Sequence, residues 1–409
     1  MRVVLAHIDL RLYWKARLKV LLGLLKSKGA SLTVIQTATS GTLYDFTNEL
    51  DSKVEGIEWI HLFRKEDKIC DIPPRTIAKA LWDRFESIEP DVIVADPISF
   101  YSGATAVRWC RYRRKGVVIM DDSRAVDVPR SWLVNHIKRR FYRNVDAMFV
   151  PAPSHVQSYV NWGIPKNRIF IGLDVVDNNF FAERALAAKT HLDNLRIRYE
   201  LPHRFFLGVG RQVPKKNWGT LISGYKQYRD ATTIRPWGLV LVGDGPERKS
   251  LENMVLENAI QGVHFRPFCD QEKLCEYYAM AECLVLASYY GETWGLVVNE
   301  AMACGLPVLI SENCGCAQTL VRQDQNGWTF SPDHPEELTE AMLRLSSLSE
   351  PERQAMGQKS REIVSKWSLE RFSWQLMRAI ELSKGESRGF YSFLDSLIIR
   401  FWKGRYNPS

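Results

Sequence analysis

Residues 291–302 read GETWGLVVNEAM and contain two carboxylates, Glu292 and Glu300, eight residues apart. Glycines on both sides of Glu292 favour a tight loop, and the apolar residues after Gly295 predict that a helix begins there. The first amides of that helix, at Gly295, Leu296 and Val297, are suited to face a phosphate. Glu300 falls further along the helix in an apolar stretch, where a carboxylate needs a hydrogen-bonding partner. A sugar or ribose hydroxyl would supply one.

A second loop, GRQVPKKN at residues 210–217, contains two cations that can converge on one anion. Gly210 closes a predicted strand, and Arg211 and Lys216 follow it on the loop. Such cations stabilise the negative charge that develops on a departing diphosphate. Asn217 is suited to cap the next helix, whose amides would add further donors. Together the two stretches predict a nucleotide-sugar site. The alternative is that residues 210–217 are only a basic surface loop and that Glu292 and Glu300 only form structural salt bridges.

Short β-branched runs alternate with segments of helical length through both halves of the chain. This alternation predicts parallel sheets with right-handed crossovers. Ligands bind beyond the carboxyl ends of the strands in such sheets, and both motifs fall there. We expect an α/β protein with two Rossmann-like, doubly wound domains that face each other across a cleft. The predicted strands are 2–6, 31–36, 57–62, 91–95, 116–120, 147–150, 168–171, 205–209, 238–242, 263–265, 283–286, 307–310 and 327–330, and predicted helices include 13–28 and 74–86.

Length and composition agree with two soluble domains. A chain of 409 residues exceeds a single core, and 45% apolar with 25% charged residues is ordinary for a globular protein. No apolar run reaches the ~18 residues of a membrane span. The first residues suggest a strand rather than a signal peptide. Eight cysteines form no disulfide framework, and Cys314-Gly315-Cys316 has the wrong spacing for zinc. We expect a reduced, cytoplasmic protein with no metal and no cofactor.

The net charge of +8 is concentrated in the first half of the chain. Residues 1–180 hold 27 Lys and Arg against 20 Asp and Glu, and residues 386–409 hold 4 against 2. A solvated basic surface and attraction to anionic lipid headgroups are the two readings to distinguish. Nucleic acid is not the partner we expect. The basic clusters are Arg108, Arg111, Arg113, Arg114 and Lys115, and then Lys138, Arg139, Arg140 and Arg143.

The spacing of Glu292 and Glu300, followed by AMACGLPV at residues 301–308, resembles the signature of the GT-B fold retaining glycosyltransferases of family 4. Residues 210–217 and the turns VGDGP at 242–246 and NGW at 326–328 stand in the order that this family shows. The resemblance is strong over residues 203–365. Over residues 1–180 it rests on the strand pattern and on GLDVVDN at 172–178, which is similar to the end of the first domain in some bacterial members.

The resemblance implies a domain plan and a set of roles. Residues 1–180 would bind the acceptor, 181–202 would be a linker, 203–365 would bind the donor, and the helices and basic aromatic tail of 366–409 would cross back to the first domain. Arg211 and Lys216 would hold the diphosphate, Glu300 the ribose and Glu292 the transferred sugar. The 243–246 turn would shape the cleft. The full donor set would be Gly210, Arg211, Lys216, Asn217, Arg266, Phe268, Glu292, Trp294, Gly295, Leu296, Val297 and Glu300.

The first half departs from the family pattern at two points. HIDLR at residues 7–11 replaces the Gly-rich loop that many relatives carry after the first strand. MDDSR at 120–124 stands where many relatives carry a histidine near the reacting carbon. Asp121 or Asp122 is our candidate to meet the acceptor hydroxyl as a base, and His7 is a weaker one. A loop carboxylate or helix cap is the structural alternative.

The sequence therefore predicts a retaining hexosyltransferase that moves a sugar from a nucleotide diphosphate sugar to a glycan or lipid-linked acceptor without a metal. The bacterial cell-surface polysaccharide or glycolipid setting, with attachment to the inner face of the membrane, is part of this expectation. Two alternatives stay open: a nucleotide-sugar epimerase of the same fold and a non-catalytic sugar-nucleotide or lipid-binding module. The tail at residues 390–406, with Phe390, Leu394, Leu397 and Phe401 at helical spacing, would either pack on the first domain or lie in a membrane interface.

Overall fold

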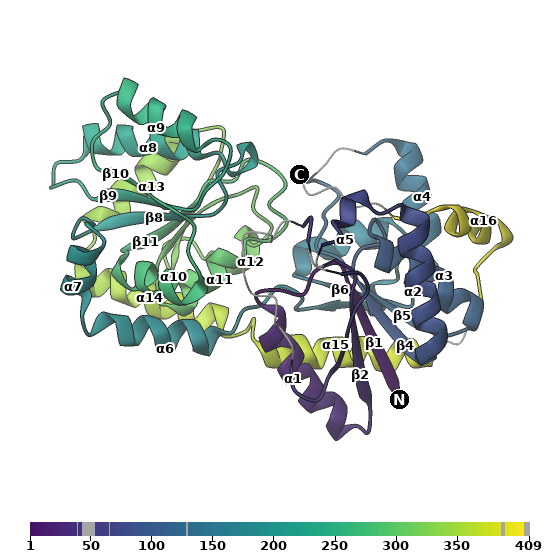
Figure 1. Ribbon diagram of the computed structural model, residues 1–409. Coiled ribbons are helices and arrows are strands. Elements are labelled where there is room, and N and C mark those ends of the chain that lie inside the picture. Colours follow the sequence, from purple (N-terminus) through teal and green to yellow (C-terminus); the bar gives the residue numbers. More distant parts are fainter. Residues whose placement is uncertain (39, 43–53, 65, 128–129, 386–388, 405–409) are drawn as a thin grey trace. The chain divides into compact units, whose positions relative to one another are not determined.

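The computed structural model describes residues 1–38, 40–42, 54–64, 66–127, 130–385 and 389–404. Its contacts divide the chain into two compact units. The first unit contains residues 1–125, 129–175 and 369–409, and the second contains 126–128 and 176–368. Figure 1 traces both by sequence colour.

The first unit is built on a seven-stranded sheet of order β3-β2-β1-β4-β5-β6-β7, in which all strands are parallel. Its central strands are buried on both faces, which is why they consist of continuous β-branched and apolar runs. Helices α2 and α3 pack together, and α1 packs with α15 (Figure 1). The elements are β1 (Arg2–His7), α1 (Trp14–Ser27), β2 (Ser31–Gln36), β3 (Glu58–His61), η1 (Ile69–Asp71), α2 (Pro74–Ile88), β4 (Val92–Ala95), α3 (Tyr101–Arg113), β5 (Gly116–Met120), α4 (Trp132–Tyr142), β6 (Ala147–Val150), α5 (Pro153–Asn161), η2 (Lys166–Arg168), β7 (Ile169–Ile171), α15 (Leu369–Lys384) and α16 (Phe393–Phe401).

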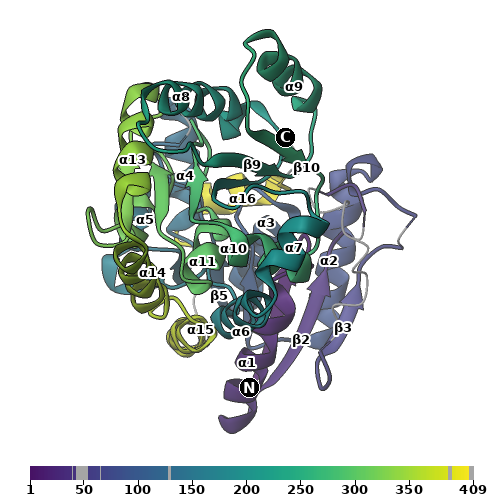
Figure 2. The same ribbon diagram turned by 90° about the vertical axis from the view of Figure 1, so that its left-hand side faces the viewer.

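The second unit is built on a six-stranded parallel sheet of order β10-β9-β8-β11-β12-β13. Helices α8 and α13 lie side by side along one flank (Figure 2), and α6 packs against α10 and α11. The elements are α6 (Asn178–Lys189), α7 (Leu192–Arg198), β8 (Phe205–Val209), η3 (Pro214–Lys216), α8 (Trp218–Ala231), β9 (Gly238–Val242), α9 (Arg248–Glu257), β10 (Val263–Arg266), α10 (Gln271–Met280), β11 (Cys283–Leu286), α11 (Leu296–Ala303), β12 (Val308–Ser311), α12 (Ala317–Leu320), β13 (Gly327–Phe330), α13 (Pro335–Ser347) and α14 (Glu350–Val364).

The predicted α/β class and the two doubly wound sheets are confirmed, and all thirteen predicted strands are present within a residue or two of their expected bounds. The segment 181–202, expected to be a linker, instead forms most of α6 and all of α7. Phe181, Ala185 and Leu195 bury their side chains in the second unit. Phe181, Ala185 and Ala188 fall on one face of α6, which explains why this helix packs on the second unit.

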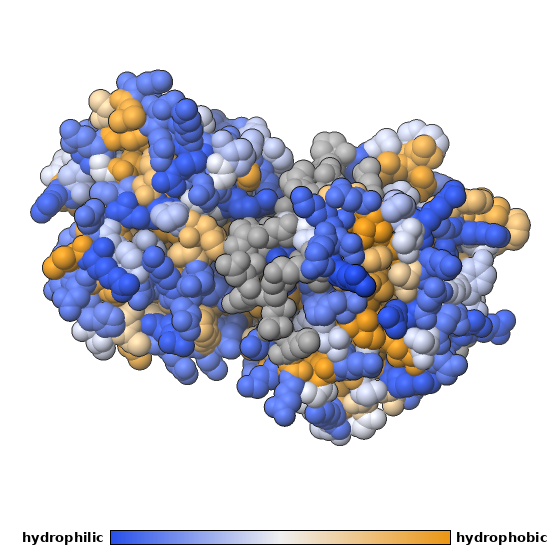
Figure 3. Space-filling model, viewed as in Figure 1, coloured by the Kyte–Doolittle hydropathy of each residue, from blue (hydrophilic) through white to orange (hydrophobic). Residues whose placement is uncertain are grey.

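The tail belongs to the first unit. Asp395 is fully buried in α16, where it accepts hydrogen bonds from Arg140 at 3.2 Å and Asn144 at 3.1 Å. Ile399 is also fully buried, and the Phe390 ring meets Tyr112 edge-on at 4.9 Å. Other apolar side chains of the tail stay exposed, namely Phe393, Leu394 and Phe401, and hydrophobic residues appear at the surface over α16 (Figure 3). Arg405 and Tyr406 lie outside the described residues. Among the described residues, no helix has the length and apolar character that crossing a membrane requires.

The basic clusters are not one solvated surface. Arg111 and Asp146 form a fully buried bidentate pair, with N–O distances of 3.1 and 2.5 Å, so the interpretation of Arg111 as a surface charge is wrong. Arg113 pairs with Glu86 at 2.6 Å on the surface. A charge count cannot show this pairing, because the acidic partners lie about 30 residues away in sequence.

Candidate functional site

The predicted donor loops meet at the centre of the second sheet. Strands β8 and β11 are neighbours, and the strand order reverses between them. This switch point, beyond the carboxyl ends of the strands, is where open α/β sheets bind ligands. The backbone N–H of Tyr289, after β11, donates to the carbonyl of Lys215, after β8, at 2.8 Å. A backbone hydrogen bond thus joins the two loops at the expected position.

The turn after β9 supports the loop after β8 through close backbone contact. A Cβ atom at Gly243 would lie 2.0 Å from the carbonyl oxygen of Gly210, and one at Gly245 would lie 2.4 Å from that of Gln212. The N–H of Gln212 also donates to the carbonyl of Asp244 at 2.8 Å. Only glycine fits at these two contacts, so the role of this turn is to shape the loop.

The ammonium of Lys216 pairs with the carboxylate of Glu292, and only 12% and 14% of these side chains are exposed. The same oxygen, Oε2, accepts a hydrogen bond from the Ser288 hydroxyl at 2.9 Å. Burial opposes ionisation of Glu292, but the Lys216 charge and these hydrogen bonds outweigh it, so the pKa of Glu292 lies below its ordinary value. Oε1 of Glu292 has no donor among the described residues. Glu292 is therefore an ionised group with one acceptor atom open.

Lys216 and Arg211 both retain donors. An ammonium has three N–H donors, and Lys216 uses one of them on Glu292. The Lys216 side chain lies across Gly210, where an added Cβ would come within 3.3 Å of its Cε. The guanidinium of half-buried Arg211 makes no hydrogen bond or ion pair with any described residue. Of Arg211 and Lys216, only Lys216 is paired with a carboxylate of the described residues.

Asn217 occupies the position before α8, but the expected side-chain cap is absent. Its backbone is left-handed, with φ of 55°, which turns the side chain away from the helix amides. Its Oδ1 accepts from the Thr220 hydroxyl at 2.8 Å and its Nδ2 donates to the carbonyl of Pro332 at 3.4 Å. The interpretation of Asn217 as a side-chain cap is therefore wrong.

The loop after β12 fixes the Glu292 loop from the other side. The N–H of Gly315 donates to the carbonyl of Glu292 at 2.9 Å, and a Cβ at Gly315 would lie 1.7 Å from the carbonyl oxygen of Thr293. The N–H of Cys316 donates to the carbonyl of Trp294 at 3.2 Å. We predicted no role for residues 314–316 beyond excluding zinc, and in the structure they support the backbone of the Glu292 loop.

Trp294 and Glu300 are both buried. The Trp294 indole donates to Asn299 at 2.9 Å and stacks on Trp367, so its side chain belongs to the core. Glu300 accepts a hydrogen bond from the Tyr278 hydroxyl at 2.7 Å, a partner that the sequence did not reveal. Gly295, with φ of 106°, precedes α11, and Leu296 and Val297 form its half-buried first turn.

Arg266 and Phe268 of the predicted donor set lie at the end of β10 and two residues after it. The Arg266 guanidinium donates to the carbonyls of Tyr199 at 2.7 Å and Glu200 at 3.2 Å, so it ties this loop to the end of α7. Phe268 is 45% exposed. A cavity of about 260 Å³ adjoins this loop and is lined by Arg198, Tyr199, Glu200, Arg266, Pro267, Cys269, Lys273 and Tyr277.

In the first unit, Asp121 and Asp122 follow β5 in different environments. Asp121 is buried, and its two oxygens accept from the Ser123 N–H at 2.9 Å and the Tyr142 hydroxyl at 2.6 Å. Asp122 is half-buried. It lies close enough to Asp174, after β7, to act on its ionisation. Burial, together with the Asp122 charge, raises the pKa of Asp174 to about 7.

Asp174 is a titratable group that we did not single out from the sequence. Its Oδ2 is buried and has no hydrogen-bond partner among the described residues. Its position directly after a predicted strand was the available signal, because the carboxyl ends of parallel strands collect functional side chains.

The loop after β1 is held by charge rather than by glycine. Asp9 and Arg11 form a buried pair at 2.5 Å, and the Thr42 hydroxyl donates to Asp9 at 2.6 Å. His7 packs against Trp14 with ring centroids 4.7 Å apart, and burial lowers its pKa to about 4. His7 is therefore neutral at physiological pH. Among the described residues, no group of three or more His, Cys, Asp and Glu side chains is placed to hold a metal ion.

Comparison with known proteins connects this geometry to a family. Residues 197–363 match the model of the family Glycosyl transferases group 1. An uncharacterized glycosyltransferase of Methanocaldococcus jannaschii is 28% identical over 179 residues, which are 44% of this chain and 48% of that protein. D-inositol 3-phosphate glycosyltransferase of Thermomonospora curvata is 29% identical over 45% of this chain and 44% of that protein. The matches thus span about half the length of these relatives.

Solved structures agree over most of the chain. Sucrose-phosphate synthase from Thermosynechococcus elongatus superposes with a TM-score of 0.70 at 20% identity, over 93% of this chain and 98% of that one. HepE from Anabaena, solved in complex with UDP-glucose, gives a TM-score of 0.69 at 16% identity, over 93% and 99%. These likenesses confirm the GT-B type of fold. The family match lies within the second unit, and the likeness to solved structures covers both units.

Proposed function

We propose that this chain transfers a sugar from a nucleotide diphosphate sugar to a hydroxyl of a glycan or lipid-linked acceptor, with retention at the anomeric carbon. The observation that carries the proposal is the pairing of Lys216 with Glu292 at the switch point of the second sheet. One site there offers free cationic donors for a diphosphate and an ionised carboxylate for sugar hydroxyls.

Each of these groups acts on a different part of the donor. Arg211 and the remaining donors of Lys216 hold the diphosphate, which gains negative charge as its bond to the sugar breaks. Oε1 of Glu292 accepts a hydrogen bond from a hydroxyl of the transferred sugar. The start of α11 adds backbone donors to the phosphates.

In the proposed reaction the acceptor hydroxyl attacks the anomeric carbon on the face from which the diphosphate departs. The bond from that carbon to the diphosphate oxygen breaks, and a bond to the acceptor oxygen forms. The acceptor proton passes to the departing phosphate oxygen or to a carboxylate of the first unit, for which Asp122 is the better exposed candidate. No protein carboxylate forms a bond to the sugar. In this proposal cationic side chains neutralise the leaving group, so no metal is required.

The donor class and the setting are part of the same proposal. HepE was solved with UDP-glucose, which supports a UDP-sugar as the first donor to try. D-inositol 3-phosphate glycosyltransferase is among the relatives, which supports a small phosphorylated acceptor. We place the chain in family 4, acting at the inner face of a membrane in polysaccharide or glycolipid assembly.

Two experiments test the proposal. Thermal shifts with UDP-, GDP- and ADP-sugars identify the donor, since a ligand at 100 times its dissociation constant adds about 2.7 kcal/mol of stability. Proton NMR of the product then reports the configuration at the anomeric carbon. Retention supports the mechanism, whereas an inverted product overturns it. Epimerised nucleotide sugar formed without acceptor would identify an epimerase, and donor binding without any turnover would identify a binding module.

A further inference from the structure

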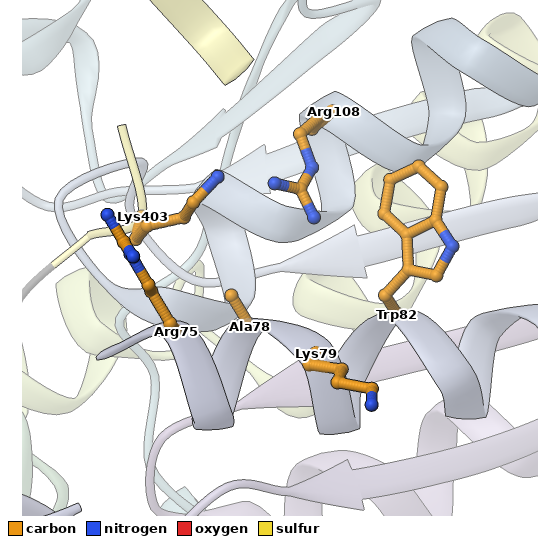
Figure 4. Close-up of a pocket in the computed structure, with 6 residues that line it drawn as sticks. All are labelled: Arg75, Ala78, Lys79, Trp82, Arg108 and Lys403. Carbon is orange, nitrogen blue, oxygen red and sulfur yellow. The ribbon is translucent and has the colours of Figure 1, made fainter. Parts of the chain in front are cut away.

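A basic pocket of about 280 Å³ lies in the first unit. Four cations from three segments line it, namely Arg75 and Lys79 on α2, Arg108 on α3 and Lys403 after α16. Ala78 and Trp82 supply its apolar wall. In Figure 4 the Arg108 guanidinium and the Lys403 ammonium point toward each other, with Arg75 beside Lys403.

None of the four cations has an acidic partner among the described residues. Glu86, the carboxylate one turn beyond Trp82 on α2, is already engaged by Arg113 and by the Trp109 indole. Like charges that converge without a counterion repel one another. Burial first, and then Arg108, Arg75 and Arg400, lower the pKa of Lys403. The pocket therefore holds excess positive charge, unlike the neighbouring Arg111 and Arg113, which are paired with Asp146 and Glu86.

The Arg108 side chain is held in place and has an unused hydrogen-bond donor. Its guanidinium lies 4.7 Å from the Trp82 ring centroid, a stacking contact that fixes its plane. Its Nε is buried and has no hydrogen-bond partner among the described residues. A buried N–H without an acceptor is costly, and arginine presents its donors in a planar fork that matches phosphate oxygens.

Lys403 is held in place by the segment that carries it. The neighbouring Trp402 indole donates to the carbonyl of Ile98 at 2.7 Å. Gly404 has φ of 78°, and a Cβ there would lie 2.4 Å from the backbone of Phe100. The tail is thus fixed against the loop after β4, and the fourth cation is part of a built site.

We propose that this pocket binds a phosphate group, as a phosphate monoester or diphosphate, independently of the donor site. The tight convergence of donors suits a compact anion of high charge better than a carboxylate. The group has two sources with the same chemistry: a soluble sugar phosphate or diphosphate, and the headgroup of a phospholipid. Phe401 is 76% exposed two residues before Lys403, which is compatible with a lipid surface.

The test uses the full chain and two variants of equal charge. Arg75→Gln/Lys403→Gln removes two pocket cations and leaves the Arg108–Trp82 contact intact. Lys15→Gln/Lys19→Gln removes two exposed cations from α1, outside the pocket, as the matched control. Melting temperatures without ligand show that both variants are folded. Arg211→Ala/Lys216→Ala is run in parallel, because pyrophosphate also fits the proposed donor site.

Two binding measurements distinguish the sources. Calorimetric titration with inorganic pyrophosphate reports soluble phosphate. Sedimentation with phosphatidylcholine vesicles containing either phosphatidic acid or phosphatidylglycerol, matched in surface charge, reports a lipid phosphate monoester. Losing two charge-assisted contacts should weaken binding at the pocket roughly 100-fold in Arg75→Gln/Lys403→Gln and leave the control unchanged.

Loss of pyrophosphate binding in the pocket variant supports a soluble ligand. Loss of a preference for phosphatidic acid over phosphatidylglycerol supports a lipid headgroup. The proposal is overturned if the pocket variant and the matched control bind both probes equally. It is also overturned if all pyrophosphate binding disappears in Arg211→Ala/Lys216→Ala while the pocket variant and the matched control show the same preference for phosphatidic acid. Neither result depends on the proposed transfer activity, which is measured separately.

Discussion

Replacing Lys216 by methionine removes its ammonium while keeping a side chain of similar length. We expect kcat/KM for sugar transfer to fall roughly 10- to 100-fold, since a charge-assisted hydrogen bond contributes about 1.5–3 kcal/mol and 1.36 kcal/mol is tenfold in rate. Stability should fall as well, because the Glu292 carboxylate stays in a site where only 14% of its side chain is exposed. Breaking a fully buried pair costs about 3–5 kcal/mol. Because the Glu292 side chain is partly exposed and keeps its hydrogen bond with Ser288, we expect Lys216→Met to lose about 1–3 kcal/mol of stability.

The double variant Lys216→Met/Glu292→Gln separates structure from chemistry. A neutral amide no longer needs a cation, so we expect it to recover much of the stability that Lys216→Met loses. Activity should not recover, because the diphosphate still lacks its cation and the sugar hydroxyl lacks a carboxylate. Lys226→Met, which breaks an exposed ion pair with Asp230 on α8, is the matched control. It should change neither the stability nor the transfer activity by much. Urea unfolding and initial rates provide the two measurements. Near-normal kcat/KM in either Lys216 variant would refute this reasoning.

The sign of the pH dependence follows from the same pair. The pKa of Glu292 in the folded protein lies below its ordinary value of 4.5. Ionised Glu292 therefore stabilises the fold above pH 4.5, and this stabilisation is lost as the pH falls through the folded-state pKa. In Lys216→Met the largest of the effects that oppose burial is lost, which should raise the pKa of Glu292. The destabilisation by this variant should therefore shrink in acid, and an unfolding series in decreasing pH measures it.

Three further predictions concern the rest of the chain. Transfer should survive excess EDTA, because we assign neutralisation of the leaving group to Arg211 and Lys216; loss of activity restored by magnesium or manganese would contradict this. Asp122→Asn should lower kcat with little change in melting temperature, whereas Asp121→Asn should lower the melting temperature, since it disrupts hydrogen bonds with Tyr142 and Ser123; the opposite ranking would make Asp121 the better candidate base. Asp395→Ala should destabilise the protein by about 1–3 kcal/mol because it strands Arg140 and Arg143, which are 21% and 28% exposed; an unchanged melting temperature would mean that the tail contributes no stability.

The strands and their order in sequence could be predicted because parallel strands are buried on both faces. Runs such as residues 92–95 and 238–242 must then be continuously apolar, and helices of matching length must separate them. The donor loops could be located for a related reason: Arg211 lies two residues, and Glu292 six residues, after the end of such a run. What the pattern cannot give is the direction of a side chain. Trp294 follows Glu292 by two residues, yet its indole is in the core and hydrogen-bonded to Asn299.

The sequence could not show which distant residues would contact the predicted site residues. Tyr278 reaches Glu300 from another helix, and Gly315 supports the Glu292 loop from the next strand end. Neither residue carries a sequence signal that identifies its partner. Asn217 shows a different limit. Its position before α8 was predictable, but its left-handed backbone, which removes the cap, was not.

The charges of the first unit show why amino-acid composition alone could not predict binding to an anionic membrane. The cluster at residues 108–115 divides into a buried ion pair at Arg111, a surface pair at Arg113 and a pocket residue at Arg108. Neutralising all of its cations together would break the fully buried pair with Asp146, so lost vesicle binding could reflect unfolding. A test of anion attraction must therefore change only cations without acidic partners. Arg75 and Lys403 meet that condition among the described residues, and the tail has to fold back before they share a pocket.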